Sequence, residues 1–227
     1  MQTFDSNLSD SSAERIPWYN VWIDVTTSPS RATFRHILAD PTSSPVRAYM
    51  WIGIVTLLVT MAQLVITQAV GGPTSAAYLP GMQAWTLLCM GIAAPVMGII
   101  GFIIGTGITH FIAGLFGGSG KFDDLAYCMG AIQAPLGIFS GLISILITVL
   151  GSFSTSGLAG LLIIVPALIS IAMGIYAMVL QVMAVGEAEY LTTGKATLVV
   201  LLPVIVSMAL GICIFAFAVA NGINQLN

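Results

Sequence analysis

Long apolar runs alternate with short polar separators along most of this chain. Five runs reach the length of about 20 residues that a helix needs to cross a bilayer, and they cover residues 46–69, 84–114, 125–150, 158–183 and 196–220. The separators are rich in Gly, Pro, Ser and Thr, as loops are. Within the runs apolar and polar residues do not alternate, which favours helices over a membrane β-barrel. The pattern therefore predicts an all-α integral membrane protein with a five-transmembrane-helix bundle.

Composition supports a location in the membrane. The chain has 227 residues, of which 57% are hydrophobic and only 7% are charged, whereas soluble domains carry about 25% charged residues. Its mean hydropathy is +1.00, and no Lys, Arg, Asp or Glu occurs between Ala48 and Gly120. So few charges cannot cover a soluble surface, which excludes a soluble protein.

The second run leaves the number of spans open, because residues 84–114 could form one helix or two short passes that turn near Pro95. The positive-inside rule favours one helix. With five spans and a cytosolic N-terminus, every basic residue lies on the cytosolic side; these residues are Arg15, Arg31, Arg35, Arg47, Lys121 and Lys195. A sixth span would place Lys121 and Lys195 outside. We therefore expect a cytosolic leader (residues 1–45), a membrane domain (46–220) and an outward C-terminal tail (221–227).

The leader contains an amphipathic pattern. Ser28 and Pro29 mark the expected start of a short helix, and its apolar residues recur at helical spacing, flanked by two arginines. Such a helix suits the interface of an anionic membrane. The residues of this predicted membrane-surface helix are Arg31, Phe34, Arg35, Ile37 and Leu38.

Signatures of catalysis are missing from the sequence. It contains no nucleotide-binding P-loop, no HExxH and no GxSxG motif, and no pair of carboxylates lies inside a span. We interpret His110, near the cytosolic end of the second span, as a packing or loop-anchoring residue, because metal sites need three or four ligands. The sequence predicts no enzyme, no cofactor, no metal site and no nucleic-acid partner.

Transport is an alternative. Ion-coupled carriers keep ionisable groups within the membrane, but the cores of the five runs contain no Asp, Glu, Lys or Arg. Their polar side chains are uncharged, and such groups more often hydrogen-bond between helices than line a path; they include Gln63, Gln68, Gln133, Gln181, Ser140, Ser144, Ser170 and Ser207. A small-solute or lipid transporter is favoured if these side chains and the span prolines enclose a wet cavity.

Charged residues reappear in two of the separators. Asp123 and Asp124 begin the third span, where carboxylates complement the helix dipole. Glu187 and Glu189 follow the end of the fourth span, where the dipole disfavours carboxylates, so they either face water, pair with Lys195, or belong to a docking surface. We predict a cytosolic-face surface for partner proteins, which consists of Lys121, Asp123, Asp124, Glu187, Glu189 and Lys195.

Two GxxxG pairs predict close helix packing. Gly101 and Gly105 form the first pair, and Gly137 and Gly141 form the second. Small residues at this spacing let helix backbones approach each other closely. Packing inside one bundle is favoured over a dimer seam.

Several segments together resemble the Yip family, the Ypt-interacting membrane proteins with a five-span domain. They are "PWYNVW" and "SPSRATFRHIL" before the first span, "THFIAGLFGGSGKFDDLAYCMGA" across the second and third, and "YAMVLQVMAVGEAEYLTTGKATLVVLLP" across the last two. The resemblance covers residues 17–207 and implies a non-enzymatic protein with a cytosolic N-terminus and an outward C-terminus. It makes Gly117, Gly118, Lys121, Gly194 and Lys195 family-motif positions.

The partner and the compartment follow from the same resemblance. Eukaryotic members associate with one another and with prenylated Rab-type GTPases in ER-to-Golgi traffic. The leader of this chain is short and similar to that of prokaryotic relatives, which favours a prokaryotic cell membrane over the ER or Golgi and restricts a Rab-type partner to a eukaryotic source.

The function expected from these observations is that of a membrane scaffold or accessory subunit. It would bind membrane-protein partners, or a second copy of itself, at its cytosolic face and through its spans, and it would contact membrane lipids. The alternatives are the small-solute or lipid transporter or channel, and a lipid-organising protein that acts through the leader helix.

Overall fold

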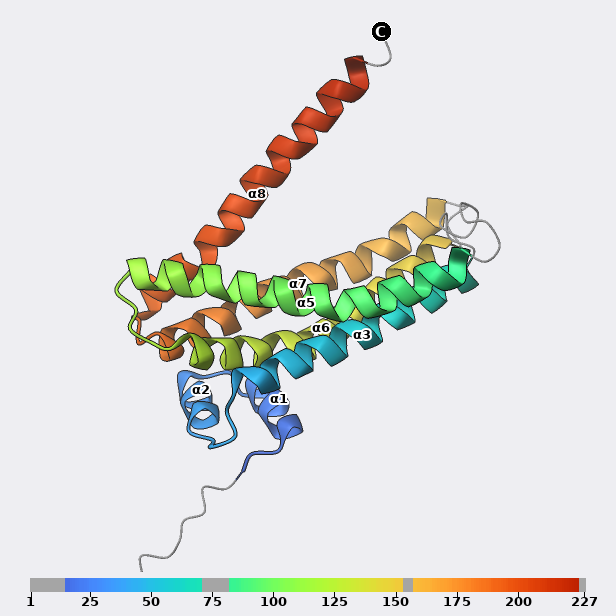
Figure 1. The fold of residues 1–227 in the computed structure, drawn as a ribbon. Helices are drawn as coiled ribbons and strands as arrows, with labels where there is room; N and C mark the ends of the chain where they lie inside the picture. Colours follow the sequence, from blue (N-terminus) through green and yellow to red (C-terminus); the bar gives the residue numbers. More distant parts are fainter. Residues whose placement is uncertain (1–14, 71–81, 153–156, 225–227) are drawn as a thin grey trace, which may run out of the picture.

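The computed structural model describes residues 15–70, 82–152 and 157–224. Within them five long apolar helices are suited to cross a membrane. These are α3 (Pro45–Ala69), α5 (Met82–Leu115), α6 (Phe122–Ser152), α7 (Gly157–Ala188) and α8 (Thr193–Asn224), and two short helices, α1 (Trp18–Thr27) and α2 (Arg31–Leu38), precede them (Figure 1). The predicted all-α fold with five spans is confirmed.

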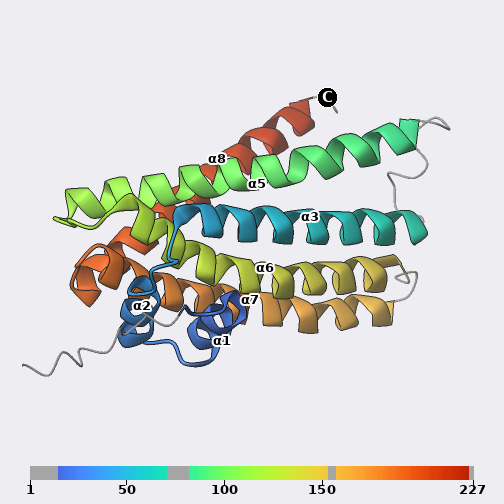
Figure 2. The same cartoon turned by 60° about the horizontal axis from the view of Figure 1, so that its bottom comes forward.

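The second apolar run forms a single helix. α5 continues from Met82 to Leu115 with Pro95 inside it, so the alternative with two short passes is excluded. The connections from α5 to α6 and from α7 to α8 therefore lie at the same end of the bundle as α1 and α2 (Figures 1 and 2). All Lys, Arg, Asp and Glu side chains of the described residues lie at this end, which we call the charged end.

The helix starts follow from local sequence signals. Ser44 caps α3, with its Oγ accepting a hydrogen bond from the N–H of Val46 at 3.3 Å, and Pro45 occupies the first turn. In α2 the cap is Ser30, whose Oγ accepts from the N–H of Thr33 at 3.0 Å. The expected start at Ser28 is therefore two residues early. The side chain of Ser30 satisfies a free helical N–H, which is the role of an N-cap.

The largest helix interface joins α3 to α6, and glycines of α6 shape it. A Cβ built on Gly137 would lie 3.2 Å from Cγ1 of Val55, and one built on Gly141 would lie 2.6 Å from Cγ1 of Val59. The two valines of α3 thus occupy the space that side chains at these positions would need. The predicted packing glycines of α6 contact a neighbouring helix of the same chain.

The other glycine pair does not pack in this way. A Cβ on Gly101 or Gly105 of α5 would meet no atom within 4 Å. Both residues line a hollow between α3, α5 and α6. The expectation that this pair packs closely inside the bundle is therefore wrong, because this part of the α5 surface does not contact a neighbouring helix.

α8 departs from the other long helices. Its first turns pack against α7 and α5, where Ala196 and Val199 are buried. Beyond Pro203 the helix runs away from the bundle (Figure 1), and Ile205, Met208 and Ile212 are exposed. Within the described side chains, this part of α8 has apolar residues on several faces without a contact from the same chain.

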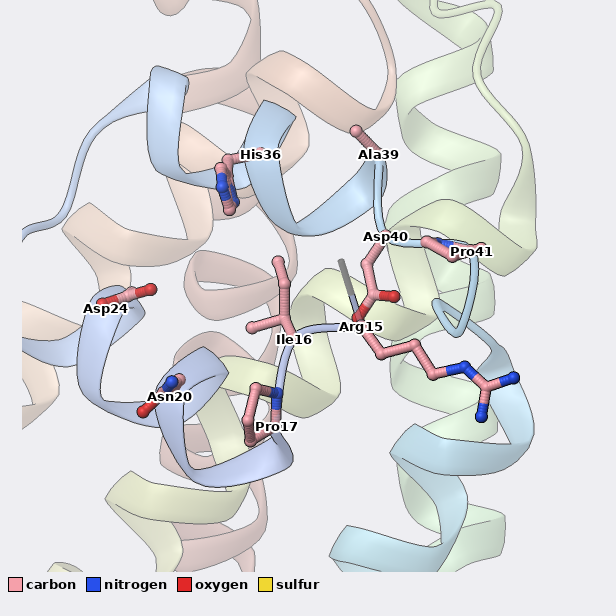
Figure 3. Close-up of a pocket in the computed structure, with 9 residues that line it drawn as sticks. All are labelled: Arg15, Ile16, Pro17, Asn20, Asp24, His36, Ala39, Asp40 and Pro41. Atoms are coloured by element: carbon pink, nitrogen blue, oxygen red, sulfur yellow. The ribbon is translucent and has the colours of Figure 1, made fainter. Parts of the chain in front are cut away.

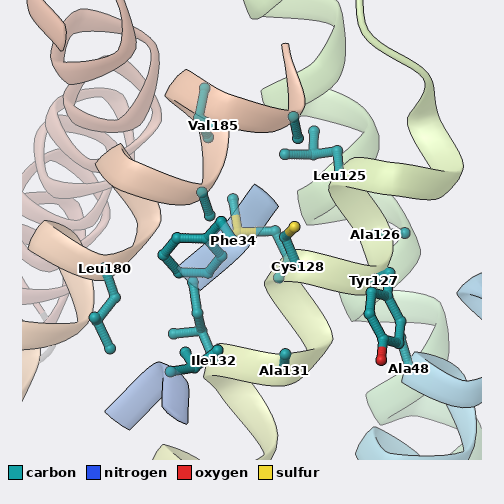
Figure 4. Close-up of a cluster of buried hydrophobic side chains, with 14 of the residues drawn as sticks. Phe34, Ala48, Leu125, Ala126, Tyr127, Cys128, Ala131, Ile132, Leu180 and Val185 are labelled. Atoms are coloured by element: carbon teal, nitrogen blue, oxygen red, sulfur yellow. The ribbon is translucent and has the colours of Figure 1, made fainter. Parts of the chain in front are cut away.

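The second helix of the leader packs against the charged end of the bundle. α2 packs against α7 and α6. Figure 4 shows the ring of Phe34 between these helices, with Leu180 and Val185 on one and Cys128 and Ile132 on the other. Burying an aromatic side chain is worth about 1.5–3 kcal/mol. This core holds α2 in place.

The prediction of a membrane-surface helix is therefore wrong for α2. Phe34 and Ile37 are fully buried, and Leu38 packs against the same core. Arg31 donates to the carbonyl oxygen of Leu191 at 3.0 Å, and Arg35 pairs with Glu187. The apolar face and both arginines are engaged by protein, because a groove between two helices satisfies an amphipathic helix as well as a lipid surface does.

α1 carries the exposed aromatic surface of the leader. Trp18, Tyr19 and Ile23 are each about half exposed. Trp18 lies beside Met50 and Ile54 at the start of α3, so its ring continues the apolar surface of the first span. Aromatic rings at this level favour the headgroup region of a bilayer.

Candidate functional site

Two loops form one structure at the charged end. In the described chain the α5–α6 loop (residues 116–121) and the α7–α8 loop (189–192) are joined by hydrogen bonds. The N–H of Ser119 donates to the carbonyl oxygen of Glu189 at 3.2 Å, and Nζ of Lys195 donates to the carbonyl oxygen of Phe116 at 2.9 Å. We call residues 116–121 and 189–195 the loop platform.

The buried side chain of Glu189 connects the segments of the loop platform by hydrogen bonds. Its Oε1 lies 2.6 Å from Nδ1 of His110, and its Oε2 accepts a hydrogen bond from the N–H of Gly120 at 3.2 Å. Glu189 is only 1% exposed. A buried carboxylate is tolerated when such partners replace its water shell. The carboxylate thus links the end of α5, the first loop and the second loop.

Glu189 does not belong to an exposed docking surface, and the prediction that placed it there is wrong. The sequence shows two glutamates, Glu187 and Glu189, two residues apart, but not which of them turns inward. The interpretation of His110 as a loop-anchoring residue agrees with its contact to Glu189.

Glycine at three loop positions is required by geometry. Gly117 has φ +87°, in the left-handed region that favours glycine. A Cβ on Gly118 would lie 2.9 Å from the carbonyl oxygen of Ala113, and one on Gly120 would overlap the carbonyl oxygen of Ala188. The "GGSG" segment therefore lets the first loop lie directly against the second.

Tyr190 is the residue of the platform that sequence reasoning missed. Its φ is 55°, a conformation that costs a residue other than glycine about 1–2 kcal/mol. Its side chain is 75% exposed. No motif identifies it, because a tyrosine after a helix end has no pattern of its own.

The remaining glutamate of the pair has a partner in the leader. Oε1 of Glu187 lies 2.7 Å from Nε of Arg35, and Oε2 lies 3.3 Å from Nη2. The hydrogen bond and the charge of Glu187 raise the pKa of the Arg35 guanidinium. Of the alternatives considered for Glu187, pairing with Lys195 is not the one observed, because α2 folds over the end of α7 and brings Arg35 to the carboxylate.

The other predicted charges stay at the surface. Lys121, Asp123 and Lys195 are exposed, and Asp124 is half-buried. Asp123 and Asp124 lie in the first turn of α6, as predicted. Among the described residues these four side chains form no salt bridge. Tyr190, Lys121, Asp123 and Lys195 are thus exposed residues of the platform and its edge.

Arg47 is a second organising residue of the charged end, and the sequence pattern did not reveal it. Its Nη1 donates to Oγ1 of Thr42 at 2.7 Å and lies 3.4 Å from Oδ2 of Asp40, and its Nη2 donates to the carbonyl oxygen of Ile16 at 3.1 Å. The guanidinium also lies over the ring of Trp51, 5.2 Å from its centroid. Arg47 therefore fastens both ends of the leader to α3.

Asp40 completes this cluster. Burial raises the pKa of its carboxyl group, but hydrogen bonds from Thr42 and the backbone of Ile16, together with the charge of Arg47, outweigh this effect, so the pKa is lowered. The carboxylate stays charged beside the arginine.

A cavity of about 350 Å³ lies between α1 and α2. Figure 3 shows that the polar side chains around it do not converge: the guanidinium of Arg15 points away from His36 and Asp24. Within the described residues no group of three His, Cys, Asp or Glu side chains is arranged to hold a metal ion.

Comparison with known proteins identifies the family of the membrane domain. The family model of the Yip1 domain matches residues 23–215. The match begins within α1 and includes α2, the loop platform and all five spans. No curated protein matches the chain. No solved structure matches it either.

Proposed function

As the chain belongs to the Yip1 domain family, whose members are not enzymes, we propose that it is a membrane scaffold or accessory subunit. It binds partner membrane proteins at the loop platform and through its spans.

Tyr190 is the observation that carries this proposal. The platform holds its backbone in the left-handed conformation while leaving the ring 75% exposed. Strained residues persist where the surrounding structure determines them, and they concentrate at functional sites. Tyrosine is enriched among residues that dominate the energy of protein interfaces. Tyr190 therefore has the properties of a partner contact.

The exposed part of α8 supports binding through the spans. Helices associate in membranes by close packing and interhelical hydrogen bonds. Beyond Pro203 the described side chains of α8 make few contacts in this chain, so this helix can accept a neighbour from another protein. A second copy of the chain is one such neighbour.

The distribution of charge supports a cytosolic charged end. All basic residues of the chain lie at this end, and positive residues favour the cytosolic side. With five spans this orientation places the C-terminus outside. A Rab-type GTPase is a partner only in a eukaryotic source.

A photoreactive amino acid at position 190 tests the proposal. The full chain with p-benzoylphenylalanine replacing Tyr190 is irradiated in its native membranes, and the same amino acid replaces Ser152, at the opposite end of α6, as a control. We expect position 190 to cross-link one defined protein that position 152 does not reach, with Lys121→Glu reducing the yield. Equal cross-linking from both positions, or only lipid adducts at position 190, would contradict the proposal.

The lipid-organising alternative now depends on α1, whose aromatic residues are half exposed, because the apolar face of α2 is buried in protein. The transporter alternative depends on whether the polar side chains of the spans line a path. Two of these side chains from α6 and two from α7 meet at one cavity.

A further inference from the structure

A cavity of about 330 Å³ lies between α6 and α7. Its polar lining consists of four side chains, two from each helix: Gln133 and Ser140 of α6, and Ser170 and Gln181 of α7. Gln133, Ser140 and Ser170 are exposed at its opening. Since both helices are spans, this opening faces the bilayer. Four uncharged polar groups from distant parts of the sequence thus meet at one membrane-facing cavity.

The cavity lies below the headgroup level of the charged end. Counted along the helices at 1.5 Å per residue, Gln181 is about 10 Å from the end of α7 and Gln133 about 16 Å from the start of α6. The leader extends this polar level along the sides of α6 and α7, because Phe34 packs beside Leu180 (Figure 4) and the hydroxyl of Tyr176 donates to the carbonyl oxygen of Thr26 at 2.7 Å. The two amides therefore lie near the level of the leader, where the ester groups and the first carbons of lipid chains are found.

The two serines and the two glutamines differ in their hydrogen bonds. Ser140 donates to the carbonyl oxygen of Gly137 at 3.0 Å, and Ser170 donates to that of Pro166 at 2.9 Å. Neither Gln133 nor Gln181 has a side-chain hydrogen bond to any other described residue. An amide without a partner in hydrocarbon costs several kcal/mol. A group from the bilayer that accepts hydrogen bonds would remove this cost.

A second hollow of about 270 Å³ adjoins the first. It lies between α3, α5 and α6 and shares Gln133 and Gly137 with the cavity. Gln133 therefore lies between two hollows, which apolar side chains and glycines line for the most part. This arrangement matches a molecule with two apolar chains joined at a polar centre.

We propose that this cavity binds one diacyl phospholipid from the leaflet at the charged end, with its glycerol ester carbonyls accepting hydrogen bonds from Gln133 and Gln181. Its acyl chains occupy the hollows on the two sides of α6. Helices of neighbouring proteins have diameters of about 10–12 Å and do not fit a hollow of this volume, whereas a flexible acyl chain does. This inference does not depend on the partner-binding role of the loop platform.

Cross-linking with a modified lipid tests the site. The full chain is reconstituted in vesicles that contain phosphatidylglycerol with a diazirine close to the ester carbonyl, irradiated, and mapped by mass spectrometry. We expect adducts on α6 and α7 around the cavity. The double variant Gln133→Leu/Gln181→Leu is expected to reduce their yield about tenfold, and Gly174→Leu is expected to reduce it by filling the cavity, since a Cβ on Gly174 meets no atom within 4 Å.

The control is Gln68→Leu, which makes the same chemical change in α3 outside the cavity and should leave the yield unchanged. Equal labelling of the wild type and the double variant would overturn the proposal, as would adducts spread evenly over all spans. Loss of labelling when the protein dimerises would identify a second copy of the chain as the occupant of the cavity. This result would also overturn the proposal.

A thermal unfolding measurement distinguishes the loss of lipid binding from misfolding of the double variant. In lipid-free detergent the double variant should unfold at the wild-type temperature or above, because it no longer carries unpaired amides. Added phosphatidylglycerol should raise the unfolding temperature of the wild type by several degrees more than that of the double variant. An equal rise in both proteins would contradict a lipid site at these amides.

Discussion

Nδ1 of His110 lies 2.6 Å from Oε1 of Glu189, although 79 positions separate the two residues in the chain. This contact connects the end of α5 to the loop that follows α7. The same carboxylate accepts a hydrogen bond from the N–H of Gly120, so a single buried side chain fixes both loops of the platform.

Replacing Glu189 should loosen the platform. Glu189→Ala leaves the N–H of Gly120 without its partner, and an unsatisfied buried group costs about 1–3 kcal/mol. Glu189→Gln keeps an oxygen that accepts from Gly120 and should recover part of this stability. Thermal unfolding in detergent measures the difference, with the exposed Asp123→Ala as a control. If Glu189→Ala is as stable as the control, the buried contact does not hold the loops.

The lowered pKa of Asp40 predicts a pH dependence of stability. The folded protein binds the proton of Asp40 more weakly than the unfolded chain, whose carboxyl group has the ordinary value of 3.8. The stabilisation by the carboxylate is therefore present above about pH 4 and is lost as the pH falls through the lower pKa of the folded state. Asp40→Asn should be less stable than the wild type near pH 7, by about 1–3 kcal/mol.

The difference between the wild type and Asp40→Asn should disappear in strong acid, where the wild-type carboxyl group is also protonated. Denaturant unfolding at a series of pH values measures this convergence. A difference that stays constant down to the acid limit would show that the charge of Asp40 is not the origin of its contribution.

Two glycine substitutions should have opposite effects. Gly141→Ala places a methyl group against Val59 of α3 and should destabilise the bundle by about 1–3 kcal/mol, as overpacking does. Gly101→Ala meets open space and should stabilise α5 by about 0.5–1 kcal/mol, because alanine loses less backbone entropy in a helix. Unfolding of both variants is measured in the same detergent. Loss of an oligomer in Gly101→Ala would instead place Gly101 in a dimer seam.

Phe34 should anchor the leader through packing. Phe34→Ala removes a fully buried ring and should cost about 3–5 kcal/mol, whereas His36→Ala, on the exposed side of the same helix, should have little effect. Hydrogen exchange of the α2 amides should accelerate in Phe34→Ala. If α2 were held by lipid, the exchange rate of the wild type in detergent would already match that of the variant.

Tyr190→Gly separates stability from function. Glycine adopts the left-handed conformation without a steric penalty of about 1–2 kcal/mol but loses about 0.5–1 kcal/mol more in backbone entropy, so the variant should gain up to about 1 kcal/mol of stability. The same change removes the exposed ring and should abolish co-purification of a partner that binds the platform. A variant that is more stable and keeps its partner would exclude the ring of Tyr190 from the interface.

Much of the fold follows from local properties of the chain. The spans are recognisable because a bilayer requires about 20 apolar residues in a helix whose own backbone bonds are complete. The start of α3 is marked by Ser44 and Pro45, which act on neighbouring N–H groups. Charge placement predicted the number of spans and the grouping of charged residues at one end, because ionised groups avoid hydrocarbon whatever their neighbours are.

The candidate site depends on contacts between distant segments, and the sequence does not contain this information in readable form. Glu187 and Glu189 are two residues apart, yet one pairs with the leader and the other turns inward to His110. Their different roles arise from the positions of α2 and α5 beside the end of α7.

Hydrophobic length and charge distribution thus determine, by themselves, a five-span membrane protein with one charged end. Only the tertiary structure decided that α2 is buried in protein, that Glu189 lies inside the platform, that Tyr190 is displayed on it, and that Gln133 and Gln181 share a cavity. The physical reason is that an amphipathic face, a carboxylate or an amide can be satisfied by water, lipid or protein. Which of these it meets is set by the packing of helices that are far apart in the chain.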